Sequence, residues 1–315
     1  MIEVKNLTKF FGAKKAVDNI SFQVEKGEIL GFLGPNGAGK STSMRMITGF
    51  IPPSAGTAVI GGFDIVQDAI AAREKIGYLP ENAPVYPDMT VYGYLEFCAE
   101  IRGFSGMDRV KKVDEAIEKC FLSDVKFQSV STLSKGFKQR VCFAQSIIHD
   151  PEYLILDEPT DGLDPNQKHE VRLMIRKMSA EKVIILSTHI LDEVDAVCTR
   201  AMIIANGQVI ADDTPAGLRA RSKIHGAVSL TLNNSSTNID QGKLISCVQD
   251  INGVKETKIL DQEADQLKIR IFPDNPNIVI ADQVMAVLGS NNYEVKSIFV
   301  EQGRLDEVFR TITSS

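Results

Sequence analysis

The most informative segment of this 315-residue chain reads Gly34-Pro35-Asn36-Gly37-Ala38-Gly39-Lys40-Ser41-Thr42. Its spacing is a glycine, four further residues, and then Gly-Lys-Ser, which is the spacing of a phosphate-binding loop. An apolar run over 29–33 precedes it and a helical pattern over 42–48 follows it. The glycines let the backbone turn tightly and approach an anion, because no Cβ stands in the way. Successive N–H groups then form a concave nest at the positive end of the following helix.

Two side chains of this segment add to the predicted phosphate site. Lys40 can reach the β- and γ-phosphates of a nucleotide, and the Ser41 hydroxyl can ligate Mg²⁺. A strand before the loop and a helix after it are the context that such a loop requires. The segment therefore predicts a nucleotide site in an α/β fold.

Length and composition limit the classes of protein to consider. A chain of 315 residues suggests two domains, and 43% hydrophobic with 24% charged residues is ordinary for a globular protein. The net charge of −6 gives no support for non-specific nucleic-acid binding, so no nucleic-acid partner is expected. No apolar run approaches the ~18 residues of a membrane span, and no secretory signal is predicted. The five cysteines are scattered and predict reduced thiols in a reducing compartment.

Polar residues follow two buried strands that the apolar runs 153–156 and 183–186 predict. Asp157 ends the first run, where it can hold Mg²⁺, and Glu158 can take a proton from an attacking water. His189 follows the second run, where a neutral imidazole can bond the γ-phosphate or position that water. One βαβ crossover separates the two runs, so we expect these side chains at one edge of a parallel sheet.

A second candidate anion site lies at residues 133–140, Leu-Ser-Lys-Gly-Phe-Lys-Gln-Arg, before another helical pattern. Ser134 is a suitable cap for that helix, and Gly136 allows a close approach. An ordinary capped helix is the alternative, which spacing alone does not exclude.

The rest of the chain predicts a divided architecture. Residues 90–148 read as helical and interrupt a series of alternating strands and helices, which is typical of a parallel sheet covered on both faces. Two strands, 2–4 and 20–24, are predicted at the N-terminus. After residue 226 the order is β-α-β-β-α-β, which suggests a ferredoxin-like domain.

Taken together and in this order, the motifs resemble those of the ATP-binding cassette (ABC) ATPases over about residues 1–220. The family's named motifs correspond to Walker A at 34–42, the signature at 133–140, Walker B with its glutamate at 153–159, the D-loop at 161–164 and the switch histidine at 187–189. The resemblance implies a P-loop cassette, 1–220, with an antiparallel β subdomain and an inserted α-helical subdomain at about 90–148. A small α+β accessory domain, 226–315, is expected to follow.

The resemblance also assigns roles to single residues. It implies catalytic roles for Glu158 and His189, and adenine stacking on Phe11. Nucleotide binding is implied for the whole Walker A, namely Gly34, Pro35, Asn36, Gly37, Ala38, Gly39, Lys40, Ser41 and Thr42. Metal binding is implied for Ser41, Asp157 and Glu81, and coupling between subunits for Glu81 and Asp164. The signature residues expected to act in trans are Ser134, Lys135, Gly136 and Phe137.

Three residues depart from the family pattern. Lys135 and Phe137 replace the usual second and fourth residues of Ser-Gly-Gly-Gln, and Glu81 replaces the usual Q-loop glutamine. Signatures of this kind resemble those of the ABC-2 branch, whose members include gliding-motility, multidrug-export and polysaccharide-export ATPases.

The resemblance implies cofactors and partners as well. ATP and Mg²⁺ are expected, with ATP held between two head-to-tail copies of the chain, a homodimer. Separate integral-membrane permease subunits are expected to carry the substrate, so this chain would be cytoplasmic and peripheral on the cytoplasmic face of the membrane. The C-terminal domain could regulate, support dimerisation, or be purely structural.

Three functions remain open at this point. The first is the ATP-hydrolysing subunit of an ABC-2 transporter, an exporter by resemblance. The second is a soluble ABC ATPase that remodels a ribosome or another macromolecular partner, but such proteins usually carry two cassettes or long coiled coils. The third is a module that binds ATP without hydrolysing it, which an intact Glu158 and His189 argue against.

Overall fold

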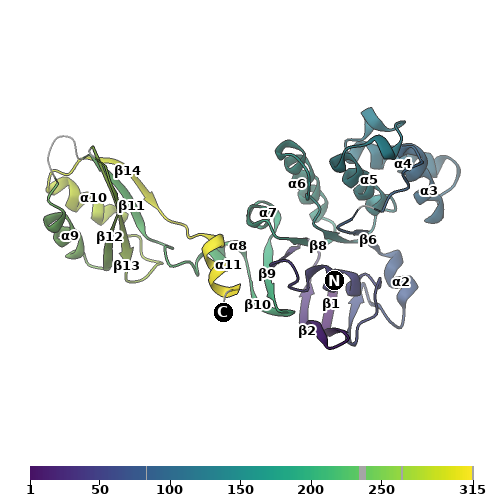
Figure 1. The fold of residues 1–315 in the computed structure, drawn as a ribbon, viewed down its shortest axis with the longest axis horizontal. Helices are drawn as coiled ribbons and strands as arrows, with labels where there is room; N and C mark the ends of the chain where they lie inside the picture. Colours follow the sequence, from purple (N-terminus) through teal and green to yellow (C-terminus); the bar gives the residue numbers. More distant parts are fainter. Residues whose placement is uncertain (83, 234–238, 264, 314–315) are drawn as a thin grey trace. The chain divides into compact units, whose positions relative to one another are not determined.

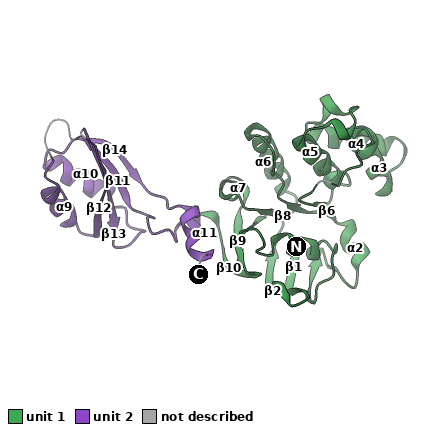
Figure 2. Ribbon diagram, in the orientation of Figure 1, with its two compact units in different colours: residues 1–215 green, residues 216–315 purple. Residues whose placement is uncertain are grey.

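The computed structural model describes residues 1–82, 84–233, 239–263 and 265–313 (Figure 1). The chain divides into two compact units, Met1–Pro215 and Ala216–Ser315 (Figure 2). The functional domain bounds expected above, 1–220 and 226–315, stay predictions.

A six-stranded sheet forms the centre of the first unit, in the order β10-β9-β3-β8-β7-β6. Its strands are β3 (Ile29–Leu33), β6 (Ile76–Leu79), β7 (Tyr153–Asp157), β8 (Val183–Thr188), β9 (Arg200–Ala205) and β10 (Gln208–Asp213). Every pairing from β9 to β6 is parallel, and only β10 runs antiparallel to its neighbour. β3, β7 and β8 are buried along their whole length, as their continuous apolar sequences predicted.

A four-stranded antiparallel sheet, ordered β2-β1-β4-β5, lies beside the central sheet. Its strands are β1 (Ile2–Phe11), β2 (Lys14–Val24), β4 (Ala55–Ile60) and β5 (Phe63–Asp64). The first two strands are longer than the sequence predicted, and they form one hairpin that reaches Phe11 and Lys14. Register shifts after Val4 and a positive φ of 49° at Asn6 break the alternation of polar and apolar residues, so the pattern was lost there.

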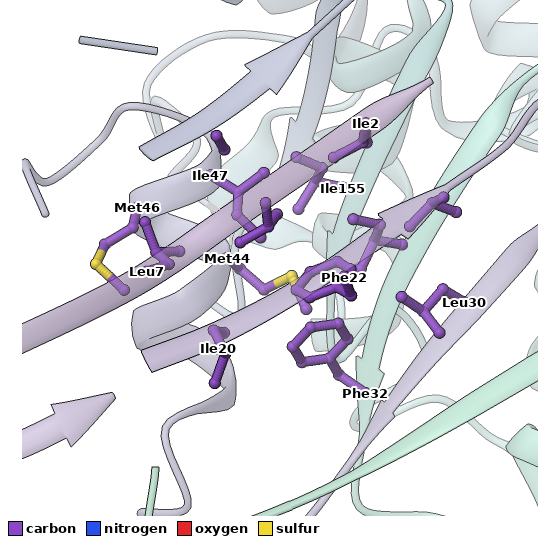
Figure 3. Packing of buried hydrophobic residues seen from close by; sticks show 14 of the residues in the cluster. Ile2, Leu7, Ile20, Phe22, Leu30, Phe32, Met44, Met46, Ile47 and Ile155 are labelled. Carbon is purple, nitrogen blue, oxygen red and sulfur yellow. The ribbon is translucent and has the colours of Figure 1, made fainter. Parts of the chain in front are cut away.

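Helix α1 (Lys40–Ile47) packs between the two sheets (Figure 3). It begins two residues earlier than predicted. The shared core draws residues from both sheets and from the helix, among them Ile2, Leu7, Ile20, Phe32, Met44, Met46, Ile47 and Ile155. This packing fixes the helix that carries the phosphate-loop lysine.

The remaining helices of the first unit fall into two groups. The helical region contains α3 (Val91–Ile101), α4 (Gly106–Lys119) and α5 (Lys135–Ile147), which lie together in Figure 1, with short 3₁₀ turns η1 (Ser123–Val125) and η2 (Val130–Thr132). The helices that connect strands are α2 (Ala69–Glu74), α6 (Pro165–Ser179) and α7 (Leu191–Val197), while α8 (Pro215–Arg219) begins at the last residue of this unit and belongs otherwise to the second. Within the described part of the chain, no helix is both long and apolar enough to span a bilayer.

The second unit has a four-stranded antiparallel sheet in the order β12-β13-β11-β14. Its elements are β11 (Val228–Asn233), α9 (Gln241–Gln249), β12 (Val254–Gln262), β13 (Gln266–Pro273), α10 (Ala281–Ser290), β14 (Val295–Val300) and α11 (Leu305–Thr313). The β-α-β-β-α-β order is the predicted one. α10 begins at Ala281, and shortly before it the Asn275 side chain accepts a bond from the Asn277 N–H and forms a turn.

Candidate active site

The phosphate loop turns at Gly39, which caps helix α1 with a left-handed φ of 107°. A Cβ at this position would lie 2.5 Å from the carbonyl oxygen of Ala16, so both the backbone and the space require glycine. Lys40 is buried, and its Nζ donates to the Gly34 carbonyl at 2.7 Å. The ammonium is thereby held inside the curve of the loop.

A cavity of about 370 Å³ lies over this loop. Its lining residues are Phe11, Lys14, Ala16, Pro35, Asn36, Gly37, Gly39, Lys40, Ser41, Thr42, Glu81 and Glu158. Most of the predicted nucleotide-binding residues therefore meet at one place, including the half-exposed Phe11 from the hairpin. Sequence reasoning missed Lys14 and Ala16, because it did not extend the hairpin to that point.

The Asp157 carboxylate at the end of β7 is buried behind the loop. Its Oδ1 accepts the Ser41 hydroxyl at 3.1 Å and also the Ser187 hydroxyl. Its Oδ2 is buried and has no hydrogen-bond partner among the described residues. An uncompensated carboxylate oxygen beside a serine hydroxyl is the oxygen donor set that Mg²⁺ prefers, so the residues present fit that ion.

Glu158 occupies a constrained position at the start of the loop after β7. Its φ is +51°, a conformation that is uncommon for a residue with a side chain. Its N–H bonds the oxygens of Ser187, carbonyl at 3.2 Å and hydroxyl at 3.1 Å, which holds that conformation. The side chain lies between Lys40 and His189: Oε1 is 3.8 Å from Lys40 Nζ, and Oε2 is 2.9 Å from His189 Nδ1.

Burial shifts the pKa values of Glu158 and Lys40 in opposite directions. It raises the pKa of the Glu158 carboxyl above its ordinary value, although the His189 hydrogen bond and the Lys40 charge oppose the change. It also lowers the pKa of Lys40, opposed by the carboxylates of Glu158, Asp157 and Glu81. The negative charge of a bound phosphate would stabilise the charged form of Lys40, which burial disfavours.

The signature residues lie elsewhere in this chain. Ser134 caps α5 by accepting the Phe137 N–H at 3.3 Å, and none of Ser134, Lys135, Gly136 and Phe137 is among the described residues that line the cavity. Lys135 is exposed and its Nζ contacts Asp161 Oδ2 at 2.5 Å. Asp164, the predicted coupling residue, caps α6 by accepting two backbone N–H bonds.

Four further polar residues connect the ends of β7 and β8, and the sequence predicted a site role for none of them. They are Thr160, Ser187, Thr188 and Glu193. The only sequence signal was the polar character of Ser187 and Thr188 at the end of an otherwise apolar strand. Glu193 gave none, since an acidic residue in the first turn of a helix is ordinary.

Residues 17–161 match the family model described as ABC transporter. The chain belongs to the ATP-binding proteins of ABC transporters. It is 30% identical over 314 residues to the linearmycin resistance ATP-binding protein LnrL of Bacillus subtilis, covering 99% of this chain and 98% of that protein. It is 32% identical to the daunorubicin/doxorubicin resistance ATP-binding protein DrrA of Streptomyces peucetius, covering 99% and 92%.

A solved structure of an ABC transporter cassette has a similar fold. A dimeric structure of MJ0796, a bacterial ABC transporter cassette, superposes with a TM-score of 0.64 at 24% identity, covering 68% of this chain and 99% of that one. The predicted cassette fold and the prediction of an ATP-binding ATPase are confirmed. The family also favours the predicted transporter ATPase over the soluble remodelling alternative.

Proposed function

We propose that this chain hydrolyses ATP to power an ABC-2 type exporter, working as a head-to-tail homodimer against integral-membrane permease subunits at the cytoplasmic face. The observation that carries the proposal is the buried Glu158 carboxylate, held between Lys40 and His189 at the edge of the phosphate cavity. This arrangement puts a proton acceptor beside the position of a terminal phosphate.

The chain's own residues divide the work of hydrolysis. The backbone N–H groups of residues 36–42 and the Lys40 ammonium bind the phosphates, and Phe11 stacks on the adenine. Glu158 Oε accepts a proton from the water whose oxygen bonds the γ-phosphorus. The bond from that phosphorus to the β–γ bridging oxygen breaks, so the oxygen stays on ADP and the γ-phosphoryl group is released as phosphate. His189 orients Glu158 through its 2.9 Å hydrogen bond and can contact the γ-phosphate through its other nitrogen.

Ser41, Asp157 and Glu81 would hold Mg²⁺. Ser41 and Glu81 line the cavity, and Asp157 has the unpartnered oxygen described above. When bound, the ion neutralises charge on the β- and γ-phosphate oxygens.

The second copy supplies the signature. Ser134, Lys135, Gly136 and Phe137 lie at the N-terminus of α5, where backbone N–H groups suit an anion, yet they do not contribute to the lining of their own chain's cavity among the described residues. The dimer of MJ0796 supports assembly of two such cassettes.

A groove on the helical region suits the permease subunits. Its volume is about 890 Å³, and its lining includes the exposed side chains of Tyr86, Phe97 and Ile101. Exposed apolar surface that is concentrated in one groove is typical of a protein interface. We assign the coupling roles to Glu81, which begins the segment leading to this groove, and to Asp164. Export, rather than import, is supported by the names of the two resistance proteins.

A membrane-association experiment tests this proposal. The tagged chain is expressed in its own cells, and membranes are isolated, cross-linked and probed for an integral-membrane partner. We expect Ile101→Glu to release the chain from membranes while the purified protein still hydrolyses ATP. Met107→Glu is the matched control, since Met107 is exposed on the neighbouring helix and does not line the groove. The proposal would be contradicted if Ile101→Glu stayed on the membranes as Met107→Glu does, or if no integral-membrane protein were cross-linked to the chain.

A further inference from the structure

One buried carboxylate is hydrogen-bonded to both segments that carry Glu158 and His189, and the proposed hydrolysis assigns it no role. Glu193 on α7 is only 2% exposed. Its Oε1 accepts the hydroxyl of Thr160, and its Oε2 accepts the hydroxyl of Thr188 at 2.6 Å. Arg172 Nη2 lies 3.8 Å from Oε1.

The two threonines flank the two residues to which we assign the chemistry. Thr188 is the last residue of β8 and directly precedes His189. Its hydroxyl also accepts the N–H of Ile190 at 3.0 Å, so it fixes the backbone on both sides of the histidine. Thr160 lies two residues beyond Glu158, in the loop whose Asp161 N–H bonds the Glu158 carbonyl at 3.1 Å.

One carboxylate therefore joins the two segments. Ser187 makes a second connection between them, since its hydroxyl donates to Asp157 and accepts the N–H of Glu158. The two connections together fix the backbone of both segments, the one that carries Glu158 and the one that carries His189. Glu158 needs such support, because its left-handed φ is unfavourable by itself.

Burying the Glu193 carboxylate costs free energy, and this cost argues for a role beyond packing. Burial raises the pKa of the Glu193 carboxyl, and the Thr188 hydrogen bond only opposes that change. A buried carboxylate is retained only where its hydrogen bonds compensate for lost water, and an apolar residue of similar volume is often as stable or more so. What the Glu193 carboxylate adds over an apolar residue is two acceptor oxygens, which bind hydroxyl groups on two separate segments at the same time.

We propose that Glu193 is a positioning residue for ATP hydrolysis, which holds Glu158 and His189 in their hydrogen-bonded geometry through Thr160 and Thr188. The proposal rests on the catalytic roles proposed for Glu158 and His189. It assigns no contact between Glu193 and the nucleotide.

Steady-state hydrolysis by the full-length chain tests it. We expect Glu193→Ala to lower kcat by roughly 10²-fold, the effect of a small misplacement of reacting groups, with KM for ATP and the Kd for ADP unchanged. Glu193→Gln keeps a carbonyl acceptor and the same shape, so it should lose much less. Thr188→Val should lower kcat while Thr188→Ser, which keeps the hydroxyl, should recover most of it.

A thermodynamic cycle distinguishes positioning from general support. If Glu193 acts through the threonines, the variant with Thr160→Val and Thr188→Val should lose no further activity when Glu193→Ala is added. Val194→Ala is the matched control, because Val194 is the next residue on α7, is fully buried, and has an apolar side chain that cannot accept a hydrogen bond from either threonine. It should lower the denaturation midpoint and leave kcat intact.

The outcomes separate this inference from the proposed function. Unchanged kcat in Glu193→Ala, or a loss that Val194→Ala reproduces at equal stability, overturns the positioning role. Losses that multiply in the cycle also overturn it. If Glu193→Ala does not fold, the comparison of Thr188→Val with Thr188→Ser decides, and equal activity of those two contradicts the proposal. Glu158→Gln is assayed in parallel, since its full activity would instead remove the catalytic assignment.

Discussion

His189 Nδ1 lies 2.9 Å from Glu158 Oε2, so the carboxyl ends of two adjacent parallel strands share one hydrogen bond beside the nucleotide cavity. The histidine is half-exposed, whereas the glutamate is buried. The imidazole can therefore reach a ligand while the carboxylate stays in a fixed place. The two residues lie 31 positions apart in the chain, and only the sheet brings them together.

Glu158→Gln should keep ATP binding and lower turnover by roughly 10²–10⁴-fold, the usual contribution of a general base. The amide has nearly the same shape, but it cannot accept the proton of the attacking water. Phosphate release under saturating ATP measures the effect, with Glu181→Gln at an exposed surface position as the control. Unchanged turnover would remove Glu158 from this role.

The same variant should change how stability depends on pH. Because burial raises the Glu158 pKa above its ordinary value of 4.5, the charged carboxylate destabilises the folded chain. Below pH 4.5 this group is protonated in both the folded and unfolded chain and costs nothing. Glu158→Gln should therefore gain stability over the parent as pH rises from 4.5 through the raised pKa. Thermal denaturation without nucleotide checks this, and a constant difference between the two proteins would contradict it.

Lys40→Ala should abolish tight ATP binding. The Lys40 ammonium is held within the loop by the Gly34 carbonyl and lines the cavity, so alanine removes the positive charge that the loop presents to a phosphate. Equilibrium dialysis measures the loss. Lys75→Ala is the control, since Lys75 pairs with Glu152 at the surface and should leave binding as it was.

Phe11→Ala should weaken nucleotide affinity by about 1–3 kcal/mol, the range measured for bases stacked on aromatic rings. Phe11 is 52% exposed and lines the cavity. Phe10 is also exposed but does not line it, so Phe10→Ala should bind like the parent. Fluorescence titration with a labelled nucleotide distinguishes the two, and equal affinities would exclude Phe11 from the adenine site.

Two ion pairs near the signature should differ in their contribution to stability. Lys135→Ala breaks an exposed contact with Asp161 and should cost less than about 1 kcal/mol. Arg140→Ala should cost more, because Arg140 is buried, pairs with Glu170 at 2.8 Å, and packs over the ring of Phe137. Urea denaturation midpoints provide the comparison, and the reverse ranking would refute this account.

Local sequence predicted those parts of the site that local chemistry determines. The loop around Lys40 and the apolar strands ending at Asp157 and Thr188 could be recognised because glycine spacing and continuous apolar runs have few alternative explanations. The β1–β2 hairpin was underpredicted, because bulges interrupt its period of two.

Contacts between distant residues could not be predicted in this way. Glu193 bonds Thr160 from 33 positions away, and Lys135 pairs with Asp161 across 26. Each is an ordinary polar residue in its local context. Only the folded sheet determines which of the many acidic residues in the chain meets which hydroxyl or amine.

Among the described residues, the buried core cluster of the second unit, Val228 to Leu288, contains none of residues 1–215. The core cluster that joins the two sheets of the first unit in turn runs from Ile2 to Ile204, so a gene that ended after Pro215 would encode a polypeptide that keeps every member of it. Loss, exchange or fusion of the final hundred codons is thus a small genetic step, and a chimaera that joins this segment to a foreign cassette would bring a complete interior with it.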